Sequence, residues 1–184
     1  MEYKEVELDQ YKKAVNNLAA LKSSLVFNNS SPEHAAIVLS TMLKYSQNEF
    51  RVYDNDLSGD ISELNPDFFS NLSLFVEANK VVKIVIDSLE TSANTTAYTT
   101  LLSYKKMFPE TVLISVANDE FKESIFEIYN KKINFALGDK SFFRIEDSNS
   151  QGSQRKAICC FNNPSVTQKL AQVFDRAFSS CQSI

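Results

Sequence analysis

The hydrophobic positions follow two alternating patterns over most of the chain, one typical of strands and one typical of helices. Val81–Ile86 is almost continuous in β-branched residues, and Thr111–Val116 has the same character. Such runs are usual for central strands that are buried on both faces. Between them, apolar residues recur at spacings of three and four, which predicts amphipathic helices. The helices predicted in this way are Asp9–Ser23, Pro32–Tyr45, one that begins at Asn65-Pro66, Asn94–Met107, a short one at Phe121–Tyr129 and one from Asn163-Pro164 to Phe178.

Three of these helices begin with the same local signal. Ser31-Pro32, Asn65-Pro66 and Asn163-Pro164 each place a capping side chain directly before a proline. A serine or asparagine accepts a hydrogen bond from the first turn, and proline is favoured at the first helical position. These pairs therefore predict where the three helices start.

After residue 130 the sequence predicts consecutive strands in place of alternating strands and helices. Ile133–Leu137 and Ser141–Ile145 flank Gly138-Asp139-Lys140 and predict a β-hairpin. Ala157–Phe161 is a last predicted strand, and shorter ones are expected at Leu25–Phe27 and Phe50–Tyr53. The alternation of strands and helices predicts an α/β fold with a mixed, mainly parallel sheet, flanked by helices and carrying a late hairpin. We expect a single domain, 1–184, with an N-terminal helix within 1–23 and a flexible polar loop at 147–154.

Composition excludes some classes of function. The net charge is −4, so no overall field favours nucleic acid. The basic pairs Lys131-Lys132 and Arg155-Lys156 are typical of solvated surface. The chain has only three glycines, which argues against a glycine-rich phosphate-binding loop. The acidic N-terminus is unlike a signal peptide and no apolar run is long enough for a membrane span, so we expect a cytoplasmic protein without membrane contact.

The cysteines and the histidine offer little chemistry. Cys159 and Cys160 are adjacent on a predicted strand and should face opposite ways, and Cys181 lies near the C-terminus. No C-x-x-C pair is present, so buried free thiols are expected. His34 is the single histidine and should sit, half-buried or on the surface, at a helix start.

The region around the hairpin carries a more specific pattern. Asp139 follows a predicted strand, Lys132 stands seven residues before it and Asn134 stands five before it. Downstream come Phe143-Arg144-Ile145-Glu146 and Phe161-Asn162-Asn163-Pro164. This run resembles the closing part of a phospholipase D-like domain, most closely over 133–178. The catalytic signature of that superfamily is His-x-Lys-x-x-x-x-Asp, and only its aspartate is matched here.

The resemblance implies that the chain keeps the phospholipase D-like fold but lacks the catalytic activity of the superfamily. In active members the signature histidine attacks phosphorus or protonates the leaving group, and the lysine neutralises phosphate oxygens. Lys132 cannot replace an imidazole that switches roles near neutral pH, and Asn134 carries no positive charge. Two such motifs normally meet across a pseudo-dyad, and this chain is about one half long. We therefore expect no catalytic residues and no cofactor.

Two interpretations of Arg144 and Glu146 remain open at this point. They are two residues apart and so share one face of a predicted strand. Arg144 could hold a phosphate or a carboxylate of a partner, or the two could form an internal ion pair that fills the vacated cleft. The residues expected to line or border this relict cleft are Lys132, Asn134, Asp139, Arg144 and Glu146.

The expected function is that of a non-catalytic binding or assembly subunit, accessory or regulatory to a bacterial multiprotein system. A protein partner is expected, a homodimer fits the family's paired sites, and nucleic acid is the less favoured partner. The alternative is a metal-dependent nuclease or phosphotransfer enzyme that uses Asp54, Asp56 and Asp87, with Asn118-Asp119-Glu120 nearby. These side chains follow predicted strands, where ligands gather in parallel sheets, but polar residues are also common wherever strands end.

Overall fold

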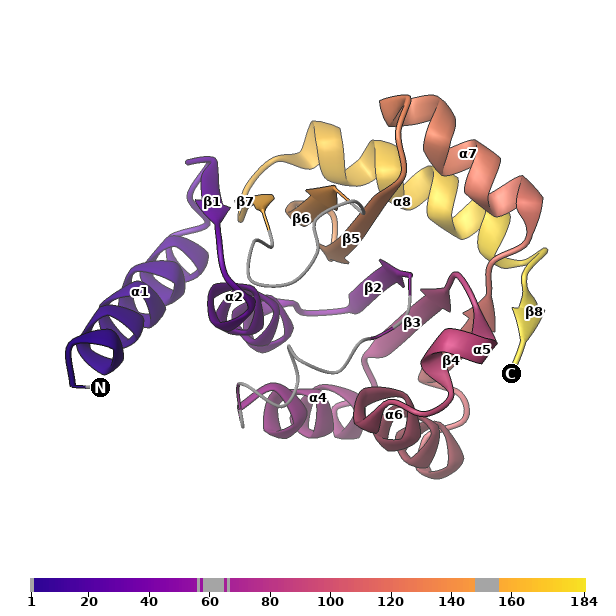
Figure 1. Ribbon diagram of the computed structural model, residues 1–184, viewed down its shortest axis with the longest axis horizontal. Helices are drawn as coiled ribbons and strands as arrows, with labels where there is room; N and C mark the ends of the chain where they lie inside the picture. The colour runs from indigo at the N-terminus through magenta and orange to yellow at the C-terminus, as the bar shows by residue number, and fades with distance from the viewer. Residues whose placement is uncertain (1, 56, 58–64, 66, 148–155) are drawn as a thin grey trace.

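A mixed eight-stranded sheet forms the centre of the molecule (Figure 1). The computed structural model describes residues 2–55, 57, 65, 67–147 and 156–184. The strand order is β1-β7-β6-β5-β2-β3-β4-β8. The strands are β1 Phe27–Asn29, β2 Glu49–Asp54, β3 Val81–Ile86, β4 Val112–Val116, β5 Ile133–Gly138, β6 Phe142–Asp147, β7 Ala157–Cys160 and β8 Gln182–Ser183.

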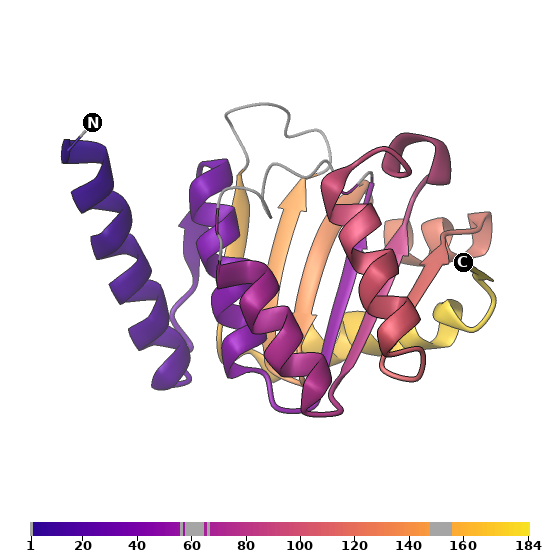
Figure 2. The same ribbon diagram turned by 90° about the horizontal axis from the view of Figure 1, so that it is seen from below.

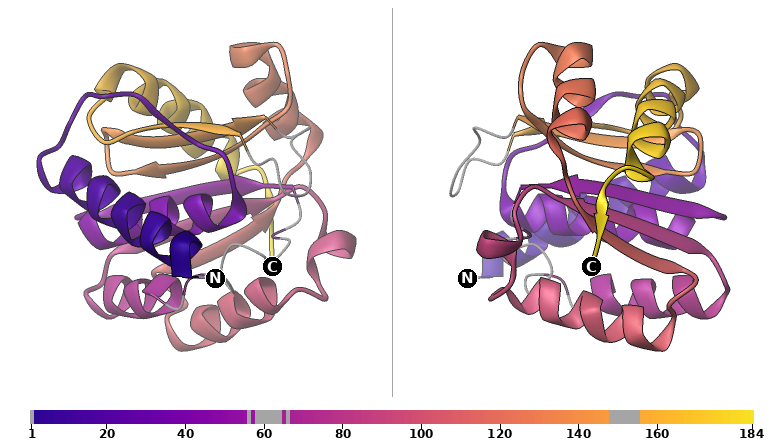
Figure 3. Two further views of the ribbon diagram at one scale, coloured as in Figure 1. Left: turned by 60° about the vertical axis from the view of Figure 1, so that its left-hand side comes forward. Right: turned by 90° about the vertical axis from the view of Figure 1, so that its right-hand side faces the viewer.

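Helices cover both faces of this sheet. One face carries α1, α2, α4 and α6, and the other carries α7 and α8 (Figures 2 and 3). In Figure 2, α1 lies at the outer edge, beside α2. The helices are α1 Glu2–Ala20, α2 Pro32–Tyr45, α4 Asp67–Glu77, α5 Leu89–Ser92, α6 Thr96–Met107, α7 Asp119–Tyr129 and α8 Pro164–Phe178. In the described part of the chain, no helix combines the length and apolar character needed to cross a bilayer.

The predicted helix starts are confirmed where the structure describes them. The Ser31 hydroxyl accepts a hydrogen bond from the backbone N–H of His34 at 3.2 Å, and α2 begins at Pro32. Asn163 Oδ1 accepts from the N–H of Val166 at 3.1 Å at the start of α8. Asn65 Oδ1 accepts from the N–H of Asp67 at 3.0 Å, directly before α4, although Pro66 lies outside the described residues.

The α/β class, the mixed sheet and the late hairpin are confirmed, but the prediction of a mainly parallel sheet is wrong. Only β2–β3 and β3–β4 pair in parallel; the other five described pairs are antiparallel. The reason is that β5 pairs with β2 in the antiparallel direction. The strands β6, β7 and β1 then extend the sheet from β5, each antiparallel to the strand before it. Repeated strand–helix–strand units make parallel pairs, and here they extend only from β2 to β4.

Smaller differences concern the edges of elements. The first helix begins at Glu2 and ends at Ala20, and the predicted helix 94–107 is a short α5 followed by α6, which Thr95 caps. The first strand lies two residues later than expected, and the short edge strand β8 was not predicted. Apart from Asp147, the loop expected at 147–154 lies outside the described residues.

Phenylalanine dominates the layer between the sheet and α7 and α8. Phe174 is fully buried, and its ring packs edge-on against Phe121 and Phe135 at centroid distances of 5.5 and 6.0 Å. These contacts hold α8 over β5 and α7.

An ion-pair network also fastens α8 to the sheet. Arg51 on β2 donates from Nε and Nη2 to the two carboxylate oxygens of Asp175 on α8, at 3.0 and 2.7 Å. Lys83 Nζ on β3 lies 2.9 Å from Asp175 Oδ1, and Glu49 Oε2 accepts from Arg51 at 2.5 Å. Only 5% of Arg51 is exposed, so these carboxylates compensate a buried charge.

Candidate functional site

A buried polar group, which we call the Arg144 cluster, lies on the α1/α2 face of the sheet. Its members are Asn29 on β1, Asn134 on β5, Arg144 and Glu146 on β6, and Cys159 on β7. Side chains alternate along β6, so Arg144 and Glu146 share the face of Phe142, which packs in the core under α2. Strand pairing sets Asn134 opposite Glu146 and Arg144 opposite Cys159.

Arg144 and Glu146 form an internal ion pair. Arg144 Nη2 lies 3.0 Å from Glu146 Oε2, with side chains 3% and 1% exposed. Arg144 Nε also donates to Asn29 Oδ1 at 3.0 Å, and the thiol of Cys159 contacts the same oxygen at 3.6 Å. Of the two interpretations that the sequence left open, the structure therefore has the internal pair.

Burial keeps the Cys159 thiol and the Tyr11 hydroxyl protonated. Burial raises the pKa of the Cys159 thiol to about 12, and the nearby Arg144 charge only partly offsets this. Burial likewise raises the pKa of Tyr11, which lies over the cluster from α1. Asn134 is 8% exposed, and its Oδ1 has no hydrogen-bond partner among the residues that the structure describes. Such a buried acceptor leaves the position polar but unable to supply a positive charge.

Asp139 lies at the opposite end of β5 from this cluster. It is five positions along the chain from Asn134, which corresponds to roughly 16 Å of extended strand. Its carboxylate accepts hydrogen bonds from three successive backbone N–H groups, those of Gln47, Asn48 and Glu49, at 2.7, 2.8 and 3.1 Å. Its own N–H donates to the carbonyl of Glu49, and its φ of 50° is left-handed. Asp139 thus fixes the connection from α2 to β2 against the hairpin turn.

Replacing Asp139 with alanine should lower the free energy of unfolding by about 2 kcal/mol, because three backbone donors lose a charged acceptor. Alanine also tolerates the left-handed backbone less well than aspartate. Chemical denaturation would measure the loss. Asp139→Asn, which keeps one carbonyl acceptor and tolerates this backbone, should lose less. An alanine variant as stable as the wild type would contradict this structural role.

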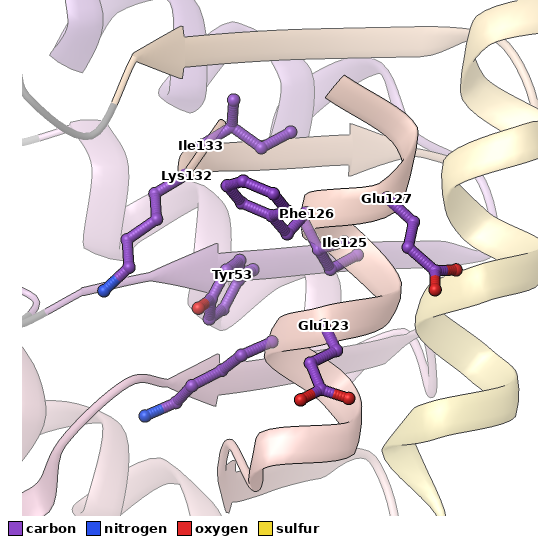
Figure 4. Close-up of a pocket in the computed structure, with 8 residues that line it drawn as sticks. Tyr53, Glu123, Ile125, Phe126, Glu127, Lys132 and Ile133 are labelled. Atoms are coloured by element: carbon purple, nitrogen blue, oxygen red, sulfur yellow. The ribbon is translucent and has the colours of Figure 1, made fainter. Parts of the chain in front are cut away.

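Lys132 lies apart from the cluster as well. It precedes β5, so the strand alternation that would place it with Asn134 does not extend to it. Instead it lines a hollow on the α7 face, which we call the α7 pocket (Figure 4). The pocket is lined by Tyr53 from β2, Lys122, Glu123, Ile125, Phe126 and Glu127 from α7, and Lys132 and Ile133.

His34 is confirmed as a half-buried residue at a helix start. Its ring stacks on Tyr11 of α1 with centroids 3.8 Å apart. Burial lowers its pKa, and the nearby carboxylates of Glu7 and Glu33 partly oppose this. Asp139 binds the backbone just beyond the far end of α2, so the length of that helix, about 16 Å from His34 to Tyr45, separates the two.

The acidic residues of the alternative metal site are engaged in other contacts. Asp87 Oδ1 lies 3.0 Å from Lys122 Nζ and accepts a hydrogen bond from the Tyr53 hydroxyl at 3.1 Å. Asp54 Oδ1 accepts from the N–H of Leu57, whereas Asp56 lies outside the described residues. Asn118 caps α7. Within the described ranges, no group of three or more His, Cys, Asp or Glu side chains could hold a metal ion.

Sequence reasoning missed Asn29 and the Tyr53–Asp87–Lys122 contacts. Asn29 follows Phe27 and Asn28 and precedes Ser30-Ser31, in a short segment that resembles an ordinary loop. Asn29 lies at the end of β1, which pairs with β7, a strand remote in sequence. No local pattern therefore marks this residue. The second group joins β2, β3 and α7, and only the completed sheet brings it together.

Comparison with known proteins supports one conclusion, about the fold. No family model matches the chain, and no curated protein matches it in sequence. A phospholipase D family member, Nuc from Salmonella typhimurium, matches at a TM-score of 0.61 and 13% identity, over 87% of this chain and 97% of that one. NucT from Helicobacter pylori gives 0.59 and 11% over 87% of this chain and all of that one. TrmBL2, an archaeal chromatin protein, gives 0.57 and 16%; all of this chain matches, but it spans only 66% of that protein. This chain therefore has the fold of the phospholipase D-like superfamily.

Proposed function

We propose that this chain is a non-catalytic phospholipase D-like subunit that binds or assembles with a protein partner. One observation carries the proposal. The chain contains a single histidine, His34, which is stacked on Tyr11 at the start of α2, while Lys132 holds the place of the signature histidine. A homodimer would only duplicate this arrangement. Neither one copy nor two would present an imidazole at the position where the superfamily's reaction needs one.

The polar residues near the motif support the same proposal. Asn134, in the place of the signature lysine, is neutral and buried. Arg144, a buried cation on the strand next to β5, is already paired with Glu146. Asp139 uses both carboxylate oxygens on the backbone of 47–49. A phosphodiester would therefore meet neither a nucleophile nor an uncompensated positive charge in the Arg144 cluster.

The test is a phosphodiesterase assay on the purified full chain, with bis-p-nitrophenyl phosphate and single-stranded DNA as substrates. We expect rates no higher than those without protein. The Lys132→Ala and His34→Ala variants identify any activity that belongs to the chain. Hydrolysis by the wild type that is lost in either variant would overturn the proposal.

The same assay with Mg²⁺, Mn²⁺ or EDTA examines the alternative of a metal-dependent enzyme. We expect no metal-dependent rate and no change in melting temperature. A metal-induced stabilisation that disappears in Asp87→Ala would favour the alternative. For the assembly part of the proposal, mass measurement of the chain in solution and after mild purification from its host should give a species larger than one chain. A monomer in both preparations would contradict it.

A further inference from the structure

Three helices border a second hollow, which we call the three-helix pocket. α2 packs against both α1 and α4, and side chains from all three helices line the pocket (Figure 2). Its volume is about 240 Å³, below the usual range for drug-sized ligands, so it suits a small molecule. Its described lining residues do not belong to the Arg144 cluster. An inference about this pocket therefore goes beyond the proposed function and stands without it.

The lining of the pocket is polar. Nine of the ten described residues that line it are polar or charged, and Ile37 is the exception. A flat apolar ligand would bury these polar groups without partners, so the lining favours a ligand that carries hydrogen-bonding groups. Each helix contributes polar side chains one turn apart, which therefore share a face. These pairs are Lys12 and Asn16 on α1, Ser40 and Lys44 on α2, and Asp67 and Asn71 on α4.

One buried hydroxyl in this lining has no partner among the described residues. Thr41 on α2 is only 3% exposed and lines the pocket, but no hydrogen bond joins its hydroxyl to another residue that the structure describes. The buried side chains beside it are satisfied. Asn71 Nδ2 donates to the Ser40 hydroxyl at 2.9 Å, and Asn65 Nδ2 donates to the carbonyl of Ala36 at 3.3 Å. Because buried polar groups are almost always hydrogen-bonded, the partner of Thr41 should come from the pocket.

The charges around the pocket favour a neutral ligand. Lys12 Nζ lies 2.5 Å from Asp67 Oδ2, so these two charges compensate each other. Lys44 lies in the last turn of α2, and its Nζ is 5.4 Å from the centre of the Tyr45 ring. The carbonyl end of a helix carries partial negative charge, which Lys44 offsets and which opposes an added anion. Hydroxyl groups, which both donate and accept, match this mixture of ammonium, carboxylate, amide and hydroxyl groups.

We propose that the three-helix pocket binds a small neutral polyhydroxylated molecule, of the class of monosaccharides and cyclitols, through a hydrogen bond to the Thr41 hydroxyl. The amide oxygens of Asn16 and Asn71 accept from other hydroxyl groups of the ligand, since the Nδ2 groups of both amides already donate within the protein, to the carbonyl of Lys12 at 2.8 Å and to Ser40 at 2.9 Å. Because α1, α2 and α4 all contribute to the pocket, its ligand holds α1 against the other two helices.

The experiment is a titration of the isotope-labelled full chain with D-glucose, D-galactose and myo-inositol, followed by nuclear magnetic resonance. We expect saturable shifts of the side-chain amide signals of Asn16 and Asn71, with a Kd below about 10 mM for at least one of the three compounds. The absence of a saturable shift with all three would overturn the proposal.

A charged analogue tests the ligand class. Glucuronate adds a carboxylate to the glucose ring, and it should bind no more tightly than the best of the three neutral compounds, because the carbonyl end of α2 opposes an anion. Tighter binding of glucuronate would mean that the pocket takes an anion through Lys44, and the proposed neutral class would be wrong.

Matched variants locate the site. Thr41→Val removes the hydroxyl and keeps the shape of the side chain, so it should weaken binding roughly tenfold. Asn16→Leu, which removes the amide oxygen on α1, should also weaken it. Thr99→Val is the control, because it removes a threonine hydroxyl from α6, outside the pocket, and should leave binding unchanged. Binding that Thr41→Val leaves unchanged, or that Thr99→Val weakens equally, would contradict the assignment.

The stability of Thr41→Val gives an independent readout. Since the hydroxyl has no partner among the described residues, its replacement by a methyl group should leave the variant at least as stable as the wild type in chemical denaturation. A marked loss of stability would show that the hydroxyl is bound within the protein, and the proposal would lose its main support.

Discussion

Replacing Glu146 with alanine is expected to lower the free energy of unfolding by about 3–5 kcal/mol. Arg144 is 3% exposed, and its guanidinium carries a positive charge. Without the carboxylate 3.0 Å away, its charge would stay buried beside the neutral Asn29 Oδ1, which accepts a hydrogen bond from Arg144 Nε at 3.0 Å. Denaturant titration followed by circular dichroism would measure the loss.

Two further variants separate charge from packing. Arg144→Met combined with Glu146→Leu removes both charges and keeps similar volume, so its stability should lie close to that of the wild type. Asp147→Ala is the matched control, because Asp147 pairs with Lys131 at 3.0 Å but both side chains are largely exposed, 37% and 50%. Its loss should stay below about 1 kcal/mol. A Glu146→Ala variant no less stable than Asp147→Ala would show that Arg144 finds water or another partner.

The outcome also bears on the proposed function. An arginine whose charge is fully compensated inside the protein is a part of the fold. If Arg144 were instead kept for an anion from outside, the Glu146→Ala variant would bind phosphate or sulfate, and these salts would restore its stability. We expect neither to do so beyond the effect they have on the wild type.

The sequence was most informative where structure is decided locally. Capping residues followed by proline gave the starts of α2 and α8, because those signals act within one turn of the helix. The β-branched run at 81–86 predicted β3, and the turn at 138–140 predicted the hairpin of β5 and β6. The sequence showed that Arg144 and Glu146 could pair, because residues two apart in a strand lie on the same face whatever the rest of the fold is. It did not show whether they pair with each other or with a partner.

The remaining features depend on residues that are far apart in the chain. The antiparallel pairing of β5 with β2 decides that the sheet is mostly antiparallel, and no local pattern in either strand specifies it. Lys132 was expected to border the same cleft as Asn134, but it lies outside β5, which begins at Ile133, and it lines the α7 pocket instead. Arg51 and Asp175 are separated by 124 positions, and nothing in their surroundings marks them as partners.

The ion pair between Arg51 and Asp175 should have the second large effect on the free energy of unfolding. Asp175→Ala should lower the free energy of unfolding by about 3 kcal/mol at neutral pH, because Arg51 loses its two-pronged acceptor and Lys83 loses its closest one. Glu49 remains beside both cations, which keeps the expected loss below that of Glu146→Ala. Thermal or chemical unfolding would measure it. Asp9→Asn is the control, since the pair of Asp9 with Lys13 on α1 is exposed and should contribute less than about 1 kcal/mol.

The contribution of Asp175 should also depend on pH in a defined direction. Partial burial would by itself raise the pKa of this carboxyl, but the hydrogen bonds and charges of Arg51 and Lys83 outweigh it and hold the pKa below its usual value of 3.8. A group whose pKa is lower in the folded state stabilises fully above the unfolded pKa and loses that contribution as the pH falls through the folded one. The difference in stability between the wild type and Asp175→Asn should therefore be constant from neutral pH down to about pH 5 and shrink below 3.8. A difference that does not change down to the acid unfolding of both proteins would mean that α8 is held by the packing of Phe174 and not by this carboxylate.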